Sequence, residues 1–276
     1  MDSSLREKIG KAAHSIQSQC DITPTIGLVL GTGLGNLATK IADCVTINYS
    51  AIPYFPVSTA PGHAGRLLLG QISGKNVVAM QGRFHLYEGY SLEEITLPIR
   101  VMKALGVQVL IESNASGGMN RYYRAGDLMI ITDHINFTGV NPLIGPNDDT
   151  LGPRFPDMSQ PYDEELIRLV EQTAFERGVR CHQGVYVGVS GPNFETRAEY
   201  RFFHAMGADA VGMSTVPEVI VARHSGLRVL GLSCITDVCI PDTLEPVDSD
   251  KVIAVARDAE PRIAQLVQEV IRRLKV

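Results

Sequence analysis

The sequence has few of the features that mark membrane, secreted and metal-binding proteins. Its five cysteines are an odd number and form no C-x-x-C pair, so we expect reduced thiols rather than disulfides and predict no zinc site. No apolar stretch approaches the roughly 18 residues of a membrane-spanning helix, and the charged residues that follow Met1 are unlike a signal peptide. These absences predict a cytoplasmic protein without a membrane partner.

An excess of positive charge is also missing. The chain has 25 Lys and Arg against 30 Asp and Glu, which gives a net charge of -5, and the basic residues are scattered. Because nucleic-acid binding needs a concentrated basic surface, we predict no nucleic-acid partner. A small anion held by a few local groups remains compatible with this composition.

Seven stretches rich in Val, Ile and Leu predict buried strands. They are Thr25–Leu30, Leu67–Ile72, Asn76–Gln81, Gln108–Glu112, Leu128–Thr132, Gly184–Val189 and Arg228–Ile235. Capping-box patterns predict helices that begin after Ser91, Thr196 and Thr215, and Ser73–Lys75 reads as a hairpin turn. The alternation predicts an α/β fold with a mixed, mostly parallel central sheet flanked by helices. With 276 residues, of which 45% are hydrophobic, we expect a single domain over residues 1–276.

Two further segments stand out by their patterns. Apolar residues at helical spacing from Val252 to Leu274 predict a long amphipathic helix that closes the chain. The stretch Asn136–Pro161 is rich in Gly, Pro, Asn and Asp and has little periodicity. Loops of that length inside a compact domain are usually functional, so we expect an active-site wall or a subunit contact there.

A glycine-rich turn, Gly31–Gly35, directly follows the first predicted strand. Its backbone N–H groups and the Thr32 hydroxyl are suited to an anion near a helix N-terminus. A nucleotide-binding oxidoreductase is an alternative, because a similar turn opens dinucleotide-binding folds. Those folds require an acidic residue about 20 positions further on, where this chain has Ser50–Tyr54. A tight connection that binds no ligand is also compatible with the turn.

Basic side chains follow the third predicted strand, within Gln81–Gly89. Ligands of open α/β sheets bind at such strand ends. If the chain stays extended, Arg83 and His85 point the same way and offer a forked cation and a second donor to one anion. A surface salt bridge beside a structural histidine is the alternative interpretation.

Small and polar residues end two other strands. Ser113–Gly118 would let backbone amides approach a ligand closely, and Met213–Thr215 offers a further hydroxyl and N–H. Helix capping alone would explain Thr215. Together with the two preceding segments, however, four strand ends could donate hydrogen bonds to one anion, which predicts an anionic substrate held without a metal.

An aromatic side chain stands next to a carboxylate in Gly191–Thr196, at a predicted helix start. Phe194 could stack on a flat heterocycle while Glu195 accepts a hydrogen bond from a ring N–H. Asp237, after the last predicted strand, could face the same ring. The alternatives are a carboxylate that favours a helix N-terminus and an Asp that forms a turn.

These segments, in this order, resemble the trimeric purine nucleoside phosphorylase family over nearly the whole chain. The matching stretches are Gly31–Gly35, Pro61–Arg66, Gln81–Gly89, Asn114–Gly118, Gly191–Glu195 and Gly207–Val219. The resemblance implies the nucleoside phosphorylase fold and the phosphorolysis of purine nucleosides or deoxynucleosides to free base and (deoxy)ribose 1-phosphate. It also implies that phosphate is a co-substrate and that no metal or other cofactor is needed.

The resemblance further implies a role for individual residues. Phosphate would be held by Thr32, His63, Arg83, His85, Ser214 and the backbone of Ala115. The ribose would be held by Tyr87 and Met213 with Tyr186 nearby, and the base by Phe194, Glu195 and Asp237. Catalytic roles fall to His85, Glu195 and Asp237. Phe155 would reach into a neighbouring subunit's site, which implies a homotrimer.

Three positions depart from the commoner family pattern. Thr32 stands where Ser is usual, Asp237 where Asn is usual, and no His occurs near Ser249, where the family tends to place one for the 5'-hydroxyl. Thr32 and Asp237 are features of the related methylthioadenosine phosphorylases. A 6-amino or 5'-methylthioadenosine phosphorylase is thus the nearest alternative, and the oxidoreductase is the alternative from another class.

Overall fold

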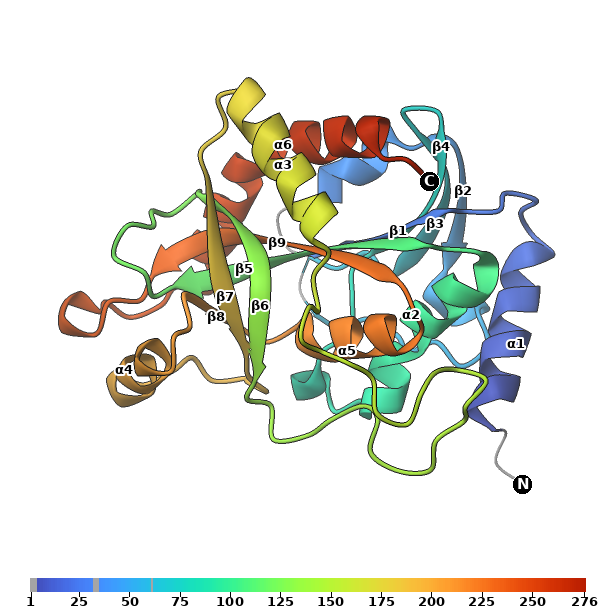
Figure 1. Ribbon diagram of the computed structural model, residues 1–276, viewed down its shortest axis with the longest axis horizontal. Helices are drawn as coiled ribbons and strands as arrows, with labels where there is room; N and C mark the ends of the chain where they lie inside the picture. Colours follow the sequence, from blue (N-terminus) through green and yellow to red (C-terminus); the bar gives the residue numbers. More distant parts are fainter. Residues whose placement is uncertain (1–3, 32–34, 61) are drawn as a thin grey trace.

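A mixed β-sheet forms the centre of the structure, a computed structural model that describes residues 4–31, 35–60 and 62–276 (Figure 1). Its strands are β1 (Ile26–Leu30), β2 (Ala42–Asn48), β3 (Arg66–Ile72), β4 (Lys75–Gln81), β5 (Val109–Gly118), β6 (Leu128–Asn136), β7 (Cys181–Gly188), β8 (Ala210–Gly212) and β9 (Arg228–Val238). Its helices are α1 (Leu5–Gln17), α2 (Leu92–Leu105), α3 (Glu164–Glu176), α4 (Arg197–Ala205), α5 (Val216–His224) and α6 (Ser249–Arg273).

The strands are ordered β2-β3-β4-β1-β5-β8-β7-β6-β9, and β9 pairs in addition with β5. This extra pairing closes β5, β8, β7, β6 and β9 into a ring. In the described part of the chain, the parallel pairs are β1–β4, β1–β5, β5–β9, β6–β7 and β7–β8. The antiparallel pairs are β2–β3, β3–β4, β5–β8 and β6–β9. The sheet is mixed, as predicted, and β1, β4, β5 and β9 all point their carboxyl ends to one edge.

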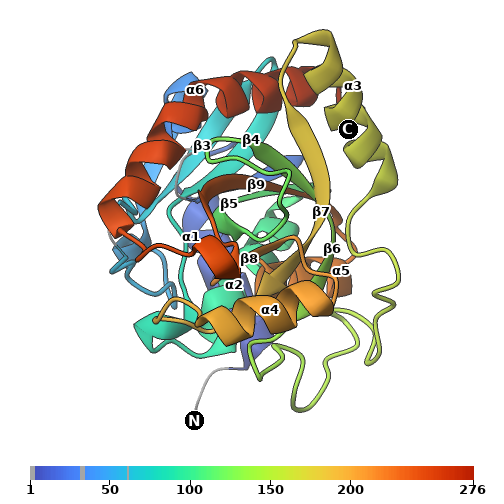
Figure 2. The ribbon, with the colours of Figure 1, turned by 90° about the vertical axis from the view of Figure 1, so that its left-hand side faces the viewer.

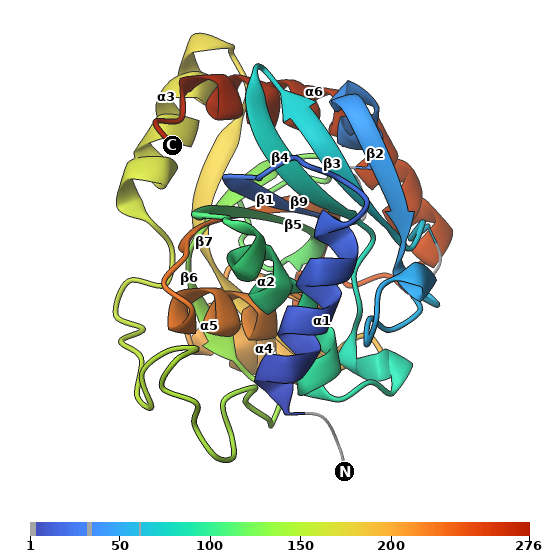
Figure 3. The ribbon, with the colours of Figure 1, turned by 90° about the vertical axis from the view of Figure 1, so that its right-hand side faces the viewer.

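Helices cover both faces of this sheet. Helices α1, α2 and α5 pack side by side on one face, and α3 and α6 pack on the other (Figures 1 and 3). The buried stripe of α6, which includes Ile263 and Leu266, confirms the predicted amphipathic closing helix. Helix α4 lies beside β7 and β8, where Tyr200 and Phe203 pack on Val211.

The seven predicted strands are all present, but several continue further than predicted. β5 runs on through the small residues Ser113–Gly118, because these pair in parallel with β9, and β9 itself continues to Val238. Residues 113–118 are therefore strand and not a loop that follows it. The edge strand β2 was not predicted, since its side chains are largely exposed and lack a clear alternation.

Local signals in the sequence were reliable guides to the connections. Ser73 and Gly74 join β3 to β4 with positive φ at both residues, the geometry of a two-residue hairpin turn. The capping boxes at Ser91, Thr196 and Thr215 are all present. The segment between β6 and α3 contains no helix or strand, as predicted for Asn136–Pro161. In the part of the chain that the structure describes, no helix is long and apolar enough to cross a membrane.

Candidate active site

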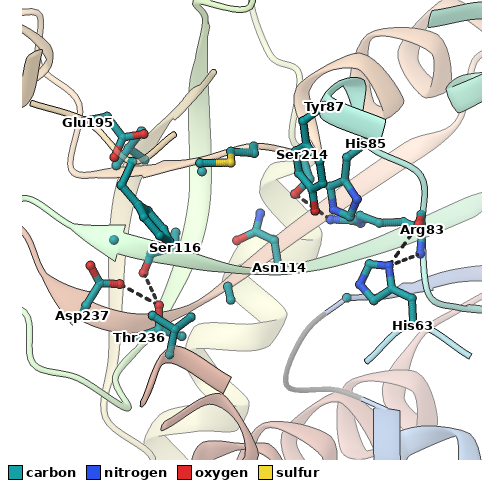
Figure 4. A pocket seen from close by; sticks show the side chains of 18 of the residues that line it. His63, Arg83, His85, Tyr87, Asn114, Ser116, Glu195, Ser214, Thr236 and Asp237 are labelled. Atoms are coloured by element: carbon teal, nitrogen blue, oxygen red, sulfur yellow. Dashed lines mark hydrogen bonds between the residues drawn. The ribbon is translucent and has the colours of Figure 1, made fainter. Parts of the chain in front are cut away.

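Strands β5 and β9 end on the side that Figure 2 turns towards the viewer. A cleft of about 200 Å³ opens there, at the edge that they share with the ends of β1 and β4 (Figure 4). It is lined by Gly31, His63, Arg83, His85, Tyr87, Asn114, Ala115, Ser116, Gly117, Phe194, Glu195, Tyr200, Val211, Gly212, Met213, Ser214, Thr236, Asp237 and Val252. Figure 4 shows its two ends. We call the part around His63, Arg83, His85 and Ser214 the cationic end, and the part around Glu195 and Asp237 the carboxylate end.

Arg83 lies at the bottom of the cationic end and is only 1% exposed. Its Nη1 donates to the hydroxyls of Ser214 (2.9 Å) and Thr215 (3.1 Å), and its Nη2 donates to Glu112 Oε2 (2.5 Å). Its Nε lies 3.5 Å from Glu218 Oε1. The guanidinium is therefore held by protein partners on one side, and Arg83 also lines the cleft.

Two fully buried carboxyl groups, Glu112 on β5 and Glu218 on α5, flank this guanidinium. Burial raises the pKa of both groups, and the neighbouring charge of Glu218 raises the pKa of Glu112 further. Both carboxyl groups thus contact the guanidinium of Arg83 from within the fold and fix its orientation.

The two histidines of the cationic end are held in fixed orientations. His63 Nδ1 contacts the main-chain N and O of Arg83 at 3.2 Å and 3.0 Å. This approach requires Gly82, because a Cβ there would lie 2.7 Å from the Cβ of His63. The His85 ring stacks between those of His63 and Tyr87, with centroid distances of 5.2 Å and 4.6 Å.

The protonation of His85 follows from its partner, Glu88. Nδ1 of His85 lies 2.9 Å from Glu88 Oε1. Despite partial burial, hydrogen bonds from Thr59 and His85 lower the pKa of Glu88, while burial lowers the pKa of His85 to about 4. We infer that a neutral His85 donates its Nδ1–H to the Glu88 carboxylate, which leaves the Nε2 lone pair for a ligand.

Ser214 is placed by the start of α5. Thr215 has a φ of 70° and donates its N–H to Glu218 Oε2 at 3.0 Å. Its hydroxyl accepts from Arg83 and also from Asn114 Nδ2 (2.8 Å). Because Ser214 Oγ accepts from Arg83, its own O–H can be donated to a ligand in the cleft.

The carboxylate end carries Phe194, Glu195 and Asp237. Burial raises the pKa of Glu195. The two oxygens of Asp237 accept hydrogen bonds from the Thr236 hydroxyl (2.9 Å) and from the Cys239 thiol (3.0 Å). Figure 4 shows both carboxylates on the side of the cleft away from His63, Arg83 and His85.

The cleft brings together most of the predicted site residues. His63, Arg83, His85, Ala115 and Ser214 line one end, and Tyr87, Phe194, Glu195, Met213 and Asp237 complete the lining. Thr32 lies outside the described residues. Across those residues, no group of three or more His, Cys, Asp or Glu side chains could hold a metal ion.

Two predicted residues lie elsewhere. Tyr186 is fully buried behind β8 and does not line the cleft; its hydroxyl accepts from the Ser214 N–H at 3.4 Å. Tyr186, expected near the ribose, thus supports Ser214 from outside the cleft. Phe155 lies on the loop before α3, is 87% exposed, and is absent from the lining of its own chain's cleft.

The sequence interpretation missed several residues of the site. Glu112 and Glu218 could not be predicted as partners of Arg83. Each lies among apolar residues of a separate element, Glu112 in β5 and Glu218 in α5. Tyr200 and Val252 line the cleft from helices that read only as amphipathic. Asn114 and Ser116 are missed polar residues that did have a local signal, since both lie inside the small-residue segment that pointed to this edge.

Comparisons with known proteins agree with this arrangement. A sequence model of the phosphorylase superfamily matches residues 25–272. The chain is 53% identical to purine nucleoside phosphorylase 1 of Bacillus subtilis, over 97% of this chain and 98% of that protein. The chain belongs to the purine nucleoside phosphorylase family. It is a pentosyltransferase that cleaves the N-glycosidic bond of purine nucleosides with phosphate, and the oxidoreductase alternative is set aside.

Solved structures share the fold over the full chain. A Schistosoma purine nucleoside phosphorylase in complex with hypoxanthine superposes with a TM-score of 0.95 at 43% identity, with 100% of both chains covered. The Schistosoma mansoni purine nucleoside phosphorylase in complex with adenosine gives a TM-score of 0.93 at 45% identity, with 98% of both chains covered. The predicted nucleoside phosphorylase fold is therefore confirmed.

Proposed function

We propose that the enzyme acts on both 6-oxopurine and 6-aminopurine nucleosides, with phosphate at the cationic end of the cleft and the base at the carboxylate end. The observation that carries this proposal is the pair of carboxylates, Glu195 and Asp237, at the end opposite the histidines. Glu195 can accept a hydrogen bond from a ring N–H of the base, and Asp237 can accept one from an amino group. Adenosine is also bound by the similar Schistosoma mansoni protein.

Phosphate is held by hydrogen-bond donors at the cationic end and by His85. Its other described partners are Arg83, the Ser214 hydroxyl, His63 and the Ala115 backbone, and Thr32 completes the set by family resemblance. Because His85 presents a lone pair at Nε2, it accepts a hydrogen bond from a phosphate O–H. The site therefore favours phosphate that still carries a proton, and attack on C1' leaves that proton on the phosphate or on His85.

The sugar lies between the two ends, against Tyr87 and Met213. Cleavage of a glycosidic bond makes the sugar oxocarbenium-like and places negative charge on the departing purine. The anionic nucleophile stabilises the first charge. Hydrogen-bond donors to the base stabilise the second, so the protonation of the carboxylate end decides how readily the base departs.

The base stacks on Phe194 and is identified by the two carboxyl groups. An ionised Glu195 accepts from N1–H of a 6-oxopurine, whereas a protonated Glu195 donates to N1 of adenine. Asp237 accepts from the 6-amino group of adenine and, when protonated, donates to N7. 5'-Methylthioadenosine is a second candidate substrate, favoured by apolar Val252, which the first turn of α6 contributes to the cleft.

We expect base release to depend strictly on phosphate for inosine, guanosine and adenosine. Each nucleoside, together with 5'-methylthioadenosine, would be incubated with and without phosphate, and free base and pentose 1-phosphate would be quantified. Equimolar amounts of the two products support the proposal. Base release at an equal rate without phosphate would indicate hydrolysis and contradict it, and inactivity towards adenosine would restrict the enzyme to 6-oxopurines.

We further propose a homotrimer in which Phe155 covers the nucleoside site of a neighbouring subunit. Its exposed ring on an irregular loop supports this role. Phe155→Ala should raise the KM for nucleoside about tenfold, the effect of losing one aromatic contact. Phe175→Ala is the matched control, because Phe175 on α3 is 86% exposed. Sedimentation should give three chain masses; a fully active monomer, or equal KM values for the two variants, would contradict the proposal.

The remaining proposals concern cofactor and location. The reaction needs phosphate as co-substrate and, we propose, no metal or organic cofactor, since the donors of the cleft suffice to bind an anion. A cytoplasmic location suits the free thiols of the structure, because the cytosol keeps cysteines reduced.

A further inference from the structure

The thiol of Cys239 has no role in the function described so far, yet it contacts a base-reading residue. Its Sγ donates to Oδ2 of Asp237 at 3.0 Å, and its side chain is fully buried. Thr236 donates to the other oxygen of the same carboxylate. Asp237 is thus held by two protein donors before any base arrives.

The backbone around this contact is built to bring the thiol and the carboxylate together. The N–H of Cys239 donates to the carbonyl of Gly118 at 2.7 Å. A Cβ at Gly117 would lie 2.6 Å from Cys239 Sγ and 3.3 Å from Asp237 Oδ2. Only glycine at this position of β5 leaves room for both groups, so the contact is fixed by the sheet and not by a mobile side chain.

The Cys239 thiol and the neighbouring Tyr200 phenol retain their protons. Burial raises the pKa of Cys239 and of Tyr200, so the thiol and the phenol stay protonated through neutral pH. The Tyr200 hydroxyl interacts with Cys239 and with the carboxyl group of Glu195. Tyr200 and Cys239 therefore link the carboxyl group of Glu195 to that of Asp237. Glu199 is the other acidic group whose charge raises the pKa of Glu195.

We propose that Cys239 is a positioning residue that sets base preference, because its thiol donates to Oδ2 of Asp237 and fixes how the carboxyl group meets the base. With Thr236 on the other oxygen, both oxygens have a fixed protein donor. This inference rests on the proposed function, in which Asp237 reads the 6-substituent and N7 of the purine.

The consequence differs between the two classes of base. Ionised Asp237 accepts from the 6-amino group of adenine but faces two acceptors, O6 and N7, in hypoxanthine or guanine. Without the thiol, one of the two protein donors that hold the carboxyl group is lost, and its hydrogen bond to the 6-amino group of adenine weakens. Loss of the thiol should therefore favour 6-oxopurine nucleosides over adenosine.

Two variants of Cys239 separate the donor from the packing. Cys239→Val fills the space without a donor, and Cys239→Ser keeps a donor. We expect the ratio of kcat/KM for inosine to that for adenosine to rise about tenfold in Cys239→Val, as for the loss of one hydrogen bond to a charged group. Cys239→Ser should retain the parent ratio. The KM for phosphate should stay unchanged in both, because phosphate binds at the other end of the cleft.

The background at position 237 gives a second readout. In an Asp237→Ala background the two substitutions should give equal ratios, because no carboxyl group is left for the thiol to hold. Cys239→Ala provides a second donorless variant if the Val variant folds poorly.

Equal ratios in the Ser and donorless variants of the otherwise unchanged enzyme would overturn the proposal. A difference that persists at full size in the Asp237→Ala background would also overturn it, because the thiol would then act on something other than the Asp237 carboxyl group. If the unmodified enzyme fails to release base with phosphate from inosine and from adenosine, the proposed function fails instead.

Discussion

Arg83→Ala should lower the free energy of unfolding by about 3–5 kcal/mol, the cost of removing one partner from a buried ion pair. Arg83 is 1% exposed and lies between the fully buried Glu112 and Glu218. Without the guanidinium, Glu218 is left as an unpaired charge in the interior. The variant would also lose the donor that orients Ser214, so weak phosphate use would accompany the loss of stability.

Urea unfolding of the variant and the parent enzyme, at equal protein concentration, would measure this effect. Arg83→Ala combined with Glu218→Gln should recover part of the loss, because the amide can still accept from the Thr215 N–H without carrying a charge. The surface variant Arg168→Ala, which breaks an exposed pair with Glu164, is the matched control and should change stability little. An unchanged midpoint for Arg83→Ala would show that the buried carboxyl groups do not need this cation.

The pH dependence of the Arg83→Ala variant has a definite sign. Burial raises the pKa of Glu218 in the folded protein, and removal of Arg83 deletes the charge that opposes this effect. A group whose pKa is raised on folding contributes stability that is present at acid pH and is lost as pH rises through the folded-state pKa. The stability deficit of Arg83→Ala should therefore be smaller in mildly acid buffer than at neutral pH.

The buried ion pairs around Arg83 show where sequence reasoning ends. The position of Arg83 after a strand correctly pointed to the carboxyl edge of the sheet, because parallel strands share that edge. Its partners could not be predicted, since Glu112 and Glu218 belong to β5 and α5 and meet Arg83 only through the packing of the sheet on that helix. The sequence alone therefore does not show that Arg83 forms ion pairs inside the protein.

Tyr186 and Cys239 illustrate a second limit, the direction of side chains on a strand. Alternation along a strand tells which residues share a face, but only the topology tells which face meets the cleft. Tyr186 lies on β7 and does not line the cleft, but its hydroxyl accepts from the N–H of Ser214, which does. Cys239 became relevant because β9 extends beyond Ile235, so that Asp237 belongs to the strand and its neighbours are fixed by pairing with β5.

The fold itself was predictable to the extent that elements were long and apolar. Strands such as β1 and β4 are buried along nearly their whole length, and the helices carry capping boxes that depend only on local chemistry. The mostly exposed edge strand β2 and the three-residue β8 lack both signals. Met213 and Ser214 directly follow β8 and line the cleft, so this short strand positions part of the site.

Asp237→Asn should raise the ratio of kcat/KM for inosine to that for adenosine by about 100-fold. In the parent enzyme, the Asp237 carboxylate accepts from Thr236 and Cys239 and faces O6 and N7 of a 6-oxopurine, which are acceptors as well. An amide at this position donates to N7 without first taking a proton from solvent. Inosine therefore gains a donor and loses a repulsion.

Adenosine should change much less, because the amide offers an oxygen to the 6-amino group and an N–H to N7 together. The shift in the ratio should thus come mainly from a rise in kcat/KM for inosine, measured with both nucleosides at saturating phosphate. Asp242→Asn is the matched control: Asp242 forms an exposed pair with Arg201, and its amide should leave the ratio unchanged. A ratio that is unaltered in Asp237→Asn, or that moves towards adenosine, would show that Asp237 does not read the base, and Glu195 alone would then have to account for the choice between the two purines.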